Sequence, residues 1–430
     1  MTTGVWNRIM ISDLGFAATP IGLLVSLRYF LAPLGVWAGR LSDQQRVFGF
    51  RRLFWIWLGR ALMVASVFIL GFETASLARG QEATALVWLV LALALLLFSL
   101  GNALSGSTFL ALVYDRAAEH QRGRAVGIVW TFLLLGFTVG GILFGVMLPS
   151  EETAAGLSFT PETLQNLFVV AGMILGSLWF FSLLGEEKRS RAALPAAKAP
   201  ESQTSLREDL MLVWRSRPMR FFAFYLALSM IFAFSQDLIL EPFAADVFNM
   251  PADVTTRFAA YWGSMSILAT IAFLFLSRRY KWMTNTVLSH VGVWVLVGTF
   301  ALFGLSAIAE LRFLVTPGLV LLGIGLGIWN VGTLGLMMDM SPFGRAGTFL
   351  GFWTLLVTFA RGFGVSGGGI VRDIVLQITD SPTLSYGVVF VVGVFGLGAA
   401  LYALSQVNVN TLQAADTRQS AEAVFAGSMD

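Results

Sequence analysis

The sequence contains no cysteine, and only two of its 430 residues are histidines, His120 and His290. Without cysteine there is neither a disulfide framework nor a thiolate metal site. The two histidines are far apart in the chain, so they do not form the cluster that a histidine-ligated metal centre needs. We therefore expect no metal site and no tightly bound cofactor.

Charge is also scarce. Charged residues make up 12% of the chain, whereas apolar residues make up 57% and the mean hydropathy is +0.76. A soluble domain usually carries about 25% charged residues, so the composition predicts an integral membrane protein in a lipid bilayer, with no nucleic-acid partner. The first 15 residues include Arg8 and Asp13 and lack a small-residue cleavage site. We therefore expect no cleavable signal peptide.

The apolar residues are gathered in blocks of about 20, the length that a helix needs to cross ~30 Å of hydrocarbon. Residues 1–14 add about half a span, because 12 residues rise only ~18 Å in a helix. We predict twelve helices, of which the first is shortened at its N-terminus. The other eleven are expected at residues 18–38, 53–73, 84–113, 125–148, 166–185, 219–246, 257–277, 285–307, 314–338, 347–371 and 385–405.

A long polar stretch at residues 185–220 divides these blocks into two sets of six helices. We predict an N-terminal transmembrane half at 1–185, a cytoplasmic linker at 186–218, a C-terminal half at 219–405 and a polar cytoplasmic tail at 406–430. The motif Gly123-Arg124-Ala125 returns as Gly344-Arg345-Ala346 in the corresponding loop of the second half. This is expected of two parallel repeats.

Most of the 28 lysines and arginines fall in one alternating set of loops, which includes the linker and the C-terminal tail. Loops rich in Lys and Arg stay on the cytoplasmic side of a membrane. An even number of spans then places the N-terminus on the cytoplasmic side as well.

The loop between the second and third predicted spans reads Gly39-Arg40-Leu41-Ser42-Asp43, followed by Gly49 and Arg51-Arg52. It resembles the signature loop of the major facilitator superfamily, G-x-L-x-D-R-x-G-R-R, stretched by two residues and with Gln44 after the aspartate. An aspartate at a helix end can cap a neighbouring helix and pair with arginine. The alternative is a positively charged loop with a tight glycine turn. The predicted cytoplasmic gate motif comprises Gly39, Asp43, Arg51, Arg52, Asp115, Arg124 and Arg345.

Polar residues at membrane depth are costly, which favours a functional interpretation. Asp237 and Glu241 are four residues apart, so we expect them on one helical face, with Pro242 kinking the helix just after them. Together with Arg8, Arg28 or Arg361 they fit a substrate or proton site, and equally a structural ion-pair network. His290 is expected to be a packed, hydrogen-bonded histidine. The predicted cavity residues are Arg28, Asn102, Gln236, Asp237, Glu241, Asn330 and Arg361.

Longer stretches are similar to the bacteriochlorophyll-delivery (PucC/LhaA-like) family of the major facilitator superfamily. The similarity is spread over nearly the whole chain. The stretches that carry it include Trp6–Ile11, Gln236–Phe243, Gly344–Gly347, Ala360–Gly362 and Arg372-Asp373. One departure is that only six residues precede Asn7, where the family has a full first helix.

The resemblance implies an all-α bundle of two six-helix, pseudo-symmetric halves. It also implies a protein that handles (bacterio)chlorophyll as cargo and delivers it during assembly of light-harvesting or photosystem complexes. The implied partners are the pigment or its precursor, chlorophyll synthase and the apoproteins. The implied location is the bacterial inner membrane or an intracytoplasmic or thylakoid membrane. With one intramembrane histidine, a bound chlorophyll would need water, amide or carbonyl ligation of its magnesium.

The alternative function is a proton-coupled secondary transporter of a small amphipathic solute, in which Asp237 or Glu241 carries the proton. We do not expect an enzyme, because the sequence shows no nucleophile–base pair, metal cluster or cofactor loop.

Overall fold

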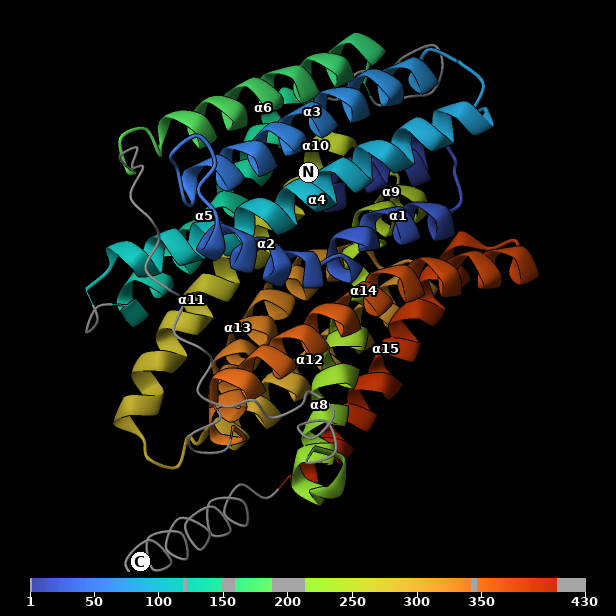
Figure 1. The fold of residues 1–430 in the computed structure, drawn as a ribbon. Coiled ribbons are helices and arrows are strands. Elements are labelled where there is room, and N and C mark those ends of the chain that lie inside the picture. Colours follow the sequence, from blue (N-terminus) through green and yellow to red (C-terminus); the bar gives the residue numbers. More distant parts are fainter. Residues whose placement is uncertain (1, 119–121, 149–158, 188–212, 342–345, 408–430) are drawn as a thin grey trace, which may run out of the picture. The chain divides into compact units, whose positions relative to one another are not determined.

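The computed structural model describes residues 2–118, 122–148, 159–187, 213–341 and 346–407, and this part of the chain is almost entirely helical (Figure 1). Ten of its helical stretches are long and apolar enough to cross a membrane, and a shorter apolar stretch lies at Leu135–Met147. The predicted all-α membrane fold is confirmed. Most of the predicted linker and tail lies outside the described residues.

Each of the eleven predicted blocks coincides with helical structure. The α-helices are α1 (Ala18–Phe30), α2 (Pro33–Gln44), α3 (Leu53–Ala78), α4 (Ala85–Arg116), α5 (Arg122–Met147), α6 (Pro161–Phe181), α8 (Arg217–Ala233), α9 (Leu240–Phe248), α10 (Ala252–Thr255), α11 (Phe258–Arg279), α12 (Asn285–Ile308), α13 (Val315–Asp339), α14 (Ala346–Thr379) and α15 (Pro382–Ser405). Short π- or 3₁₀-helical turns are η1 (Thr2–Trp6), η2 (Ile9–Asp13), η4 (Ser235–Asp237) and η5 (Arg312–Leu314).

The chain forms two compact units that alternate along the sequence. The first unit comprises residues 1–199, 235–264 and 365–386, and the second comprises 200–234, 265–364 and 387–430. These units group residues by contact and cut across the predicted halves at 1–185 and 219–405. The division into two repeats therefore stays a prediction, and each unit is described by itself.

In the first unit, α3 packs against α4 and α6, and α4 also packs against α1 and α2 (Figure 1). Two glycines bring α3 and α4 together: a Cβ atom on Gly59 would meet the carbonyl oxygen of Gly101, and the reverse also holds. On α3, Gly71 accommodates the ring of Phe168 from α6 in the same way. Small residues at such crossings let helix backbones approach closely in a membrane.

The N-terminal segment, residues 4–13, is buried within the first unit. Trp6, Asn7 and Ile9 are all 0% exposed. The indole Nε1 of Trp6 donates a hydrogen bond to Thr74 Oγ1 on α3 at 3.0 Å. This segment is therefore a packed element of the unit.

In the second unit, α12 packs against α13, with Gly332 lying against the backbone nitrogen of Ser289. A Cβ atom on Gly364 of α14 would meet the carbonyl oxygen of Ile231, near the end of α8. The core of this unit is aromatic, and the rings of Phe222 and Trp353 meet edge to face at 5.1 Å.

The predicted span at 219–246 is broken into two helices. α8 ends at Ala233, η4 follows, and α9 begins at Leu240. Pro242 lies in the first turn of α9, where its missing N–H leaves no helical hydrogen bond unmade. The expectation that Asp237 and Glu241 share one helical face is therefore wrong, because the helix breaks before Glu241 and not after Pro242.

Candidate functional site

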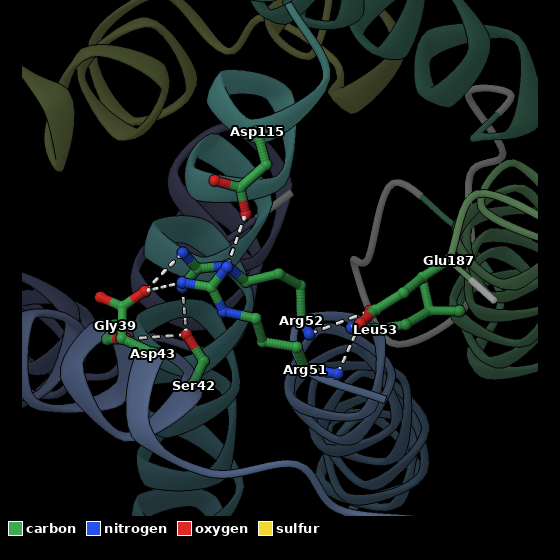
Figure 2. Close-up of polar contacts among 8 residues, drawn as sticks. All are labelled: Gly39, Ser42, Asp43, Arg51, Arg52, Leu53, Asp115 and Glu187. Atoms are coloured by element: carbon green, nitrogen blue, oxygen red, sulfur yellow. Dashed lines mark hydrogen bonds and ion pairs between the residues drawn. The ribbon is translucent and has the colours of Figure 1, made fainter. Parts of the chain in front are cut away.

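The predicted gate motif forms an ion cluster in the first unit. Asp43 lies near the end of α2, Arg51 and Arg52 directly precede α3, and Asp115 lies near the end of α4. Asp43 Oδ1 accepts hydrogen bonds from Nη2 of Arg51 at 2.8 Å and from Nη2 of Arg52 at 2.5 Å. Asp115 Oδ2 accepts from Arg52 Nε at 3.1 Å. Figure 2 shows both guanidinium groups between the two carboxylates.

Arg52 is the centre of this cluster. Its side chain is 6% exposed, whereas that of Arg51 is 30% exposed and those of Asp43 and Asp115 are about 40% exposed. Its Nη1 also donates to Ser42 Oγ at 2.6 Å, and Ser42 donates to the carbonyl of Gly39 at 2.7 Å (Figure 2). All three nitrogen atoms of the planar guanidinium thus donate hydrogen bonds to different side chains, which the single ammonium group of a lysine cannot do in this geometry. Arg52 joins the ends of α2 and α4 to the start of α3.

Glu187 was not predicted and completes the cluster from beyond α6. Its carboxylate accepts from the backbone N–H groups of Arg51, Arg52 and Leu53 at 2.5, 3.0 and 2.9 Å (Figure 2). These are N–H groups at the start of α3, where no helical acceptor exists. A carboxylate there is favoured by both hydrogen bonding and the helix dipole. The cap that we expected of Asp43 is thus supplied by Glu187.

Two members of the predicted gate motif are not placed. The side chain of Arg124 and the whole of Arg345 lie outside the described residues. Gly39, Asp43, Arg51, Arg52 and Asp115 are brought together, with Asp43 paired to arginine as expected. The arrangement can hold three helix ends in one position. Its role as a gate stays a prediction.

The predicted cavity residues are divided between the two units. In the first unit, Gln236 Nε2 donates to Asp237 Oδ1 at 2.8 Å. Arg28 lies in the last turn of α1, where a cation is favoured by the helix dipole, and its guanidinium stacks 4.7 Å from the Tyr29 ring centroid. Asn102 is exposed on α4. That these residues line one cavity stays a prediction.

Glu241 is the most buried acid of the predicted set, at 4% exposure. It lies in the first turn of α9 and accepts a long hydrogen bond from Asn7 Nδ2 at 3.4 Å. Asn7 lies in the N-terminal segment, which was predicted only as a shortened helix. Glu241 was therefore predicted as a site residue, but its contact with Asn7 was not.

In the second unit, Arg361 stacks on an aromatic pair. Its guanidinium carbon lies 4.0 Å from the ring centroid of Phe234, and the Phe234 ring meets Trp329 edge to face at 6.2 Å. Asn330 is half-buried on α13. His290 Nδ1 lies 2.9 Å from the carbonyl oxygen of Thr286, which confirms the expectation of a hydrogen-bonded histidine.

A second buried ion cluster of the first unit was also missed. Asp373 on α14 pairs with the neighbouring Arg372 at 2.9 Å, and Arg372 pairs with Asp246 on α9 at 3.3 Å. The hydroxyl of Tyr386 on α15 donates to Asp246 Oδ2 at 2.5 Å. Arg372 lies one residue beyond the predicted span at 347–371, but α14 continues to Thr379, and the arginine is buried within this helix.

The helical spans and the signature-loop ion cluster together define a membrane protein with the major facilitator fold, the fold of many transporters. In agreement, the chain aligns with a bacterial homolog of the human lysosomal transporter Spinster, solved in an inward-facing and occupied conformation. The TM-score is 0.70, at 13% identity, over 96% of this chain and 94% of that one.

The chain belongs to the PUCC protein family, whose model matches residues 5–412. It is 29% identical to the "Bacteriochlorophyll synthase 44.5 kDa chain" of Rhodobacter capsulatus, over 99% of this chain and 94% of that protein. It is 28% identical to "Protein PucC" of Rhodovulum sulfidophilum, over 87% of this chain and 82% of that protein.

Proposed function

We propose that this protein handles (bacterio)chlorophyll and delivers it during assembly of light-harvesting or photosystem complexes. The observation that carries the proposal is the family match over residues 5–412. A relative whose name refers to bacteriochlorophyll aligns with nearly the whole chain, which adds support. The cargo is then the pigment or its precursor, and the partners are the apoproteins that accept it and the chlorophyll synthase that supplies it.

We infer that the chain carries or presents a molecule and does not itself catalyse a synthase reaction. Its fold is that of transporters, although one relative is named as a synthase chain. The ion cluster around Arg52 joins three helix ends through charge-assisted hydrogen bonds, which suits an element that closes and opens. The name of that relative is consistent with a protein that acts together with a synthase without being the catalytic chain.

We place the cluster around Arg52 on the cytoplasmic side, together with both chain termini. The support is the concentration of Lys and Arg in that set of loops. The membrane is then a bacterial inner membrane or an intracytoplasmic or thylakoid membrane, where pigment–protein complexes are assembled.

A second candidate function is proton-coupled transport of a small amphipathic solute. The buried carboxyl group of Glu241 favours it, because intramembrane acids mark proton pathways in transporters. The two functions differ in what they require: a transporter moves solute in proteoliposomes when a proton gradient is applied, whereas a delivery protein needs an acceptor apoprotein.

The test is complementation in a phototrophic bacterium from which its own family members have been deleted. We expect this gene to restore the near-infrared absorption of the light-harvesting complexes, without a change in total pigment synthesis. Restored pigment synthesis with unassembled complexes would contradict delivery. Failure to restore either, with the protein present in the membrane and a proton-driven solute flux in liposomes, would favour the second function.

A further inference from the structure

Glu241 and Asn7 form a buried polar pair in which neither side chain is fully satisfied. Asn7 is 0% exposed and Glu241 4% exposed. The Nδ2 of Asn7 donates to the carbonyl oxygen of Leu238 at 2.7 Å and reaches Glu241 Oε2 only at 3.4 Å. The short bond to Leu238 fixes the amide with its nitrogen toward that carbonyl. Asn7 Oδ1 is buried, and no donor among the described residues forms a hydrogen bond with it.

The charged groups on the elements around this pair make their short contacts elsewhere. On the N-terminal segment, Arg8 pairs with Asp13 and donates to the carbonyl oxygen of Met250 at 3.1 Å. On η4, Asp237 accepts from Gln236, and its negative charge also acts on Glu241. On α9 itself, Asp246 pairs with Arg372. Among the described residues, no Lys, Arg or His forms an ion pair with Glu241.

The two protonation states of Glu241 have different requirements. An ionised carboxylate that is buried without an ion pair costs several kcal/mol. The Asn7 amide at 3.4 Å and the backbone N–H of Glu241 itself offset only part of that cost. A neutral carboxyl group needs far less compensation. Water stabilises the ionised form, and separation of the N-terminal segment from α9 would expose Glu241 to water.

We propose that Glu241 is a proton-binding site, and that a bound proton holds the N-terminal segment, residues 4–13, against α9. The ligand is the proton itself, so this site does not depend on which cargo the protein carries. Proton release then favours separation of the segment, because the separated state binds the proton more weakly. The packed state is therefore favoured at low pH and is lost as the pH rises.

The equilibrium between the packed and separated states of the N-terminal segment affects other parts of the first unit, because the segment contacts two other elements there. Trp6 donates a hydrogen bond to Thr74 on α3, and Arg8 donates one to the carbonyl oxygen of Met250, just after α9. Separation of the segment breaks these two hydrogen bonds together with the one from Asn7 to Glu241. One proton thus controls whether α3 and α9 are bridged by this segment.

The chain has no cysteine, so a single introduced cysteine reports opening without background. Ile9→Cys places a thiol at a position that is 0% exposed, and it reacts with a maleimide only when the segment separates. Ala83→Cys, in the exposed turn before α4, gives the intrinsic pH dependence of the thiol. The measured quantity is the ratio of the two labelling rates in the full-length protein in detergent.

We expect this ratio to rise with pH by up to about tenfold per unit, the limit for release of one proton. Glu241→Gln should keep the ratio low at every pH, because the amide cannot ionise. Glu186→Gln makes the same chemical change at an exposed carboxylate, so it is the matched control and should leave the rise in place. A rise that persists in Glu241→Gln overturns the proposal, as does faster labelling of Glu241→Gln at every pH, which would mean that the charged form holds the segment.

A second measurement does not depend on the introduced cysteine. In infrared difference spectra between low and high pH, the wild-type protein should show the carbonyl stretch of a buried, protonated carboxylic acid. That band should be absent in Glu241→Gln and present in Glu186→Gln, the control at an exposed carboxylate. Its presence in Glu241→Gln would assign the proton to another group and overturn the proposal, whether or not Ile9→Cys folds.

Discussion

The carboxylate of Asp373 accepts a hydrogen bond from the backbone N–H of Thr19 at 2.6 Å, and a second from Ala18 at 3.0 Å. These are the first two residues of α1, whose N-cap residue, Ala17, has no side chain that can accept such bonds. Asp373 therefore caps a helix that lies more than 350 residues earlier in the chain. Arg372 and Asp246 extend the link to α9.

We predict that Asp373→Asn destabilises the protein by roughly 2–3 kcal/mol. It weakens a helix cap, worth about 1 kcal/mol, and leaves the buried Arg372 with one fewer carboxylate. Thermal unfolding in detergent, followed by size-exclusion chromatography, measures the loss. Asp380→Asn is the control, because Asp380 is exposed just beyond the end of α14. An equal effect of both substitutions would show that the cap contributes little.

Arg52→Lys should lower the stability of the first unit by about 2–3 kcal/mol, because Lys cannot reach Asp43, Asp115 and Ser42 together. The matched control is Arg51→Lys, which alters a more exposed side chain and should cost less than about 1 kcal/mol. The same unfolding measurement compares them. A larger effect of Arg51→Lys would contradict the placement of Arg52 at the centre of the cluster.

Glu187→Ala should cost about 1–2 kcal/mol and fray the start of α3, because three backbone N–H groups lose their acceptor. Hydrogen exchange at residues 51–55 should become faster, with α6 unchanged. Glu186→Ala changes the neighbouring exposed carboxylate and serves as the control. Exchange that stays at the wild-type rate in Glu187→Ala would show that the cap does not form.

Arg361 and Phe234 should be energetically coupled. The stack at 4.0 Å predicts a coupling of about 0.5–2 kcal/mol in a double-mutant cycle of Arg361→Ala and Phe234→Leu. If the arginine is structural, Arg361→Ala also lowers the amount of protein in the membrane. A coupling near zero, with normal expression and lost pigment delivery, would instead assign Arg361 to cargo binding.

The helical spans could be predicted from the sequence because they depend on a local property, a run of about 20 apolar residues. The break between α8 and α9, at residues 234–239, could not be predicted in this way. Pro242 marked it only approximately, since a proline is tolerated in the first turn of a helix and the break lies on its N-terminal side. The prediction that Asp237 and Glu241 share one helical face was wrong for this reason.

The pairing of Asp43 with Arg51 and Arg52 could be predicted because these residues match a known signature and lie within one loop. Glu187 and Asp373 could not, because both act on helices that lie far away in the sequence. One signal was present: the N-cap residues Arg52 and Ala17 cannot cap their own helices with a side chain. A buried helix start of this kind requires an acceptor from elsewhere, but the sequence does not say which acid supplies it.

Pigment binding tests the central claim most directly. The protein is purified in mild detergent from a phototrophic host, and its absorption spectrum is recorded after size-exclusion chromatography. The account predicts chlorophyll or bacteriochlorophyll bands that elute with the protein at a fixed ratio, or that transfer to a light-harvesting apoprotein when it is added. A protein peak without pigment, which takes up none from added bacteriochlorophyll and passes none to the apoprotein, would contradict it.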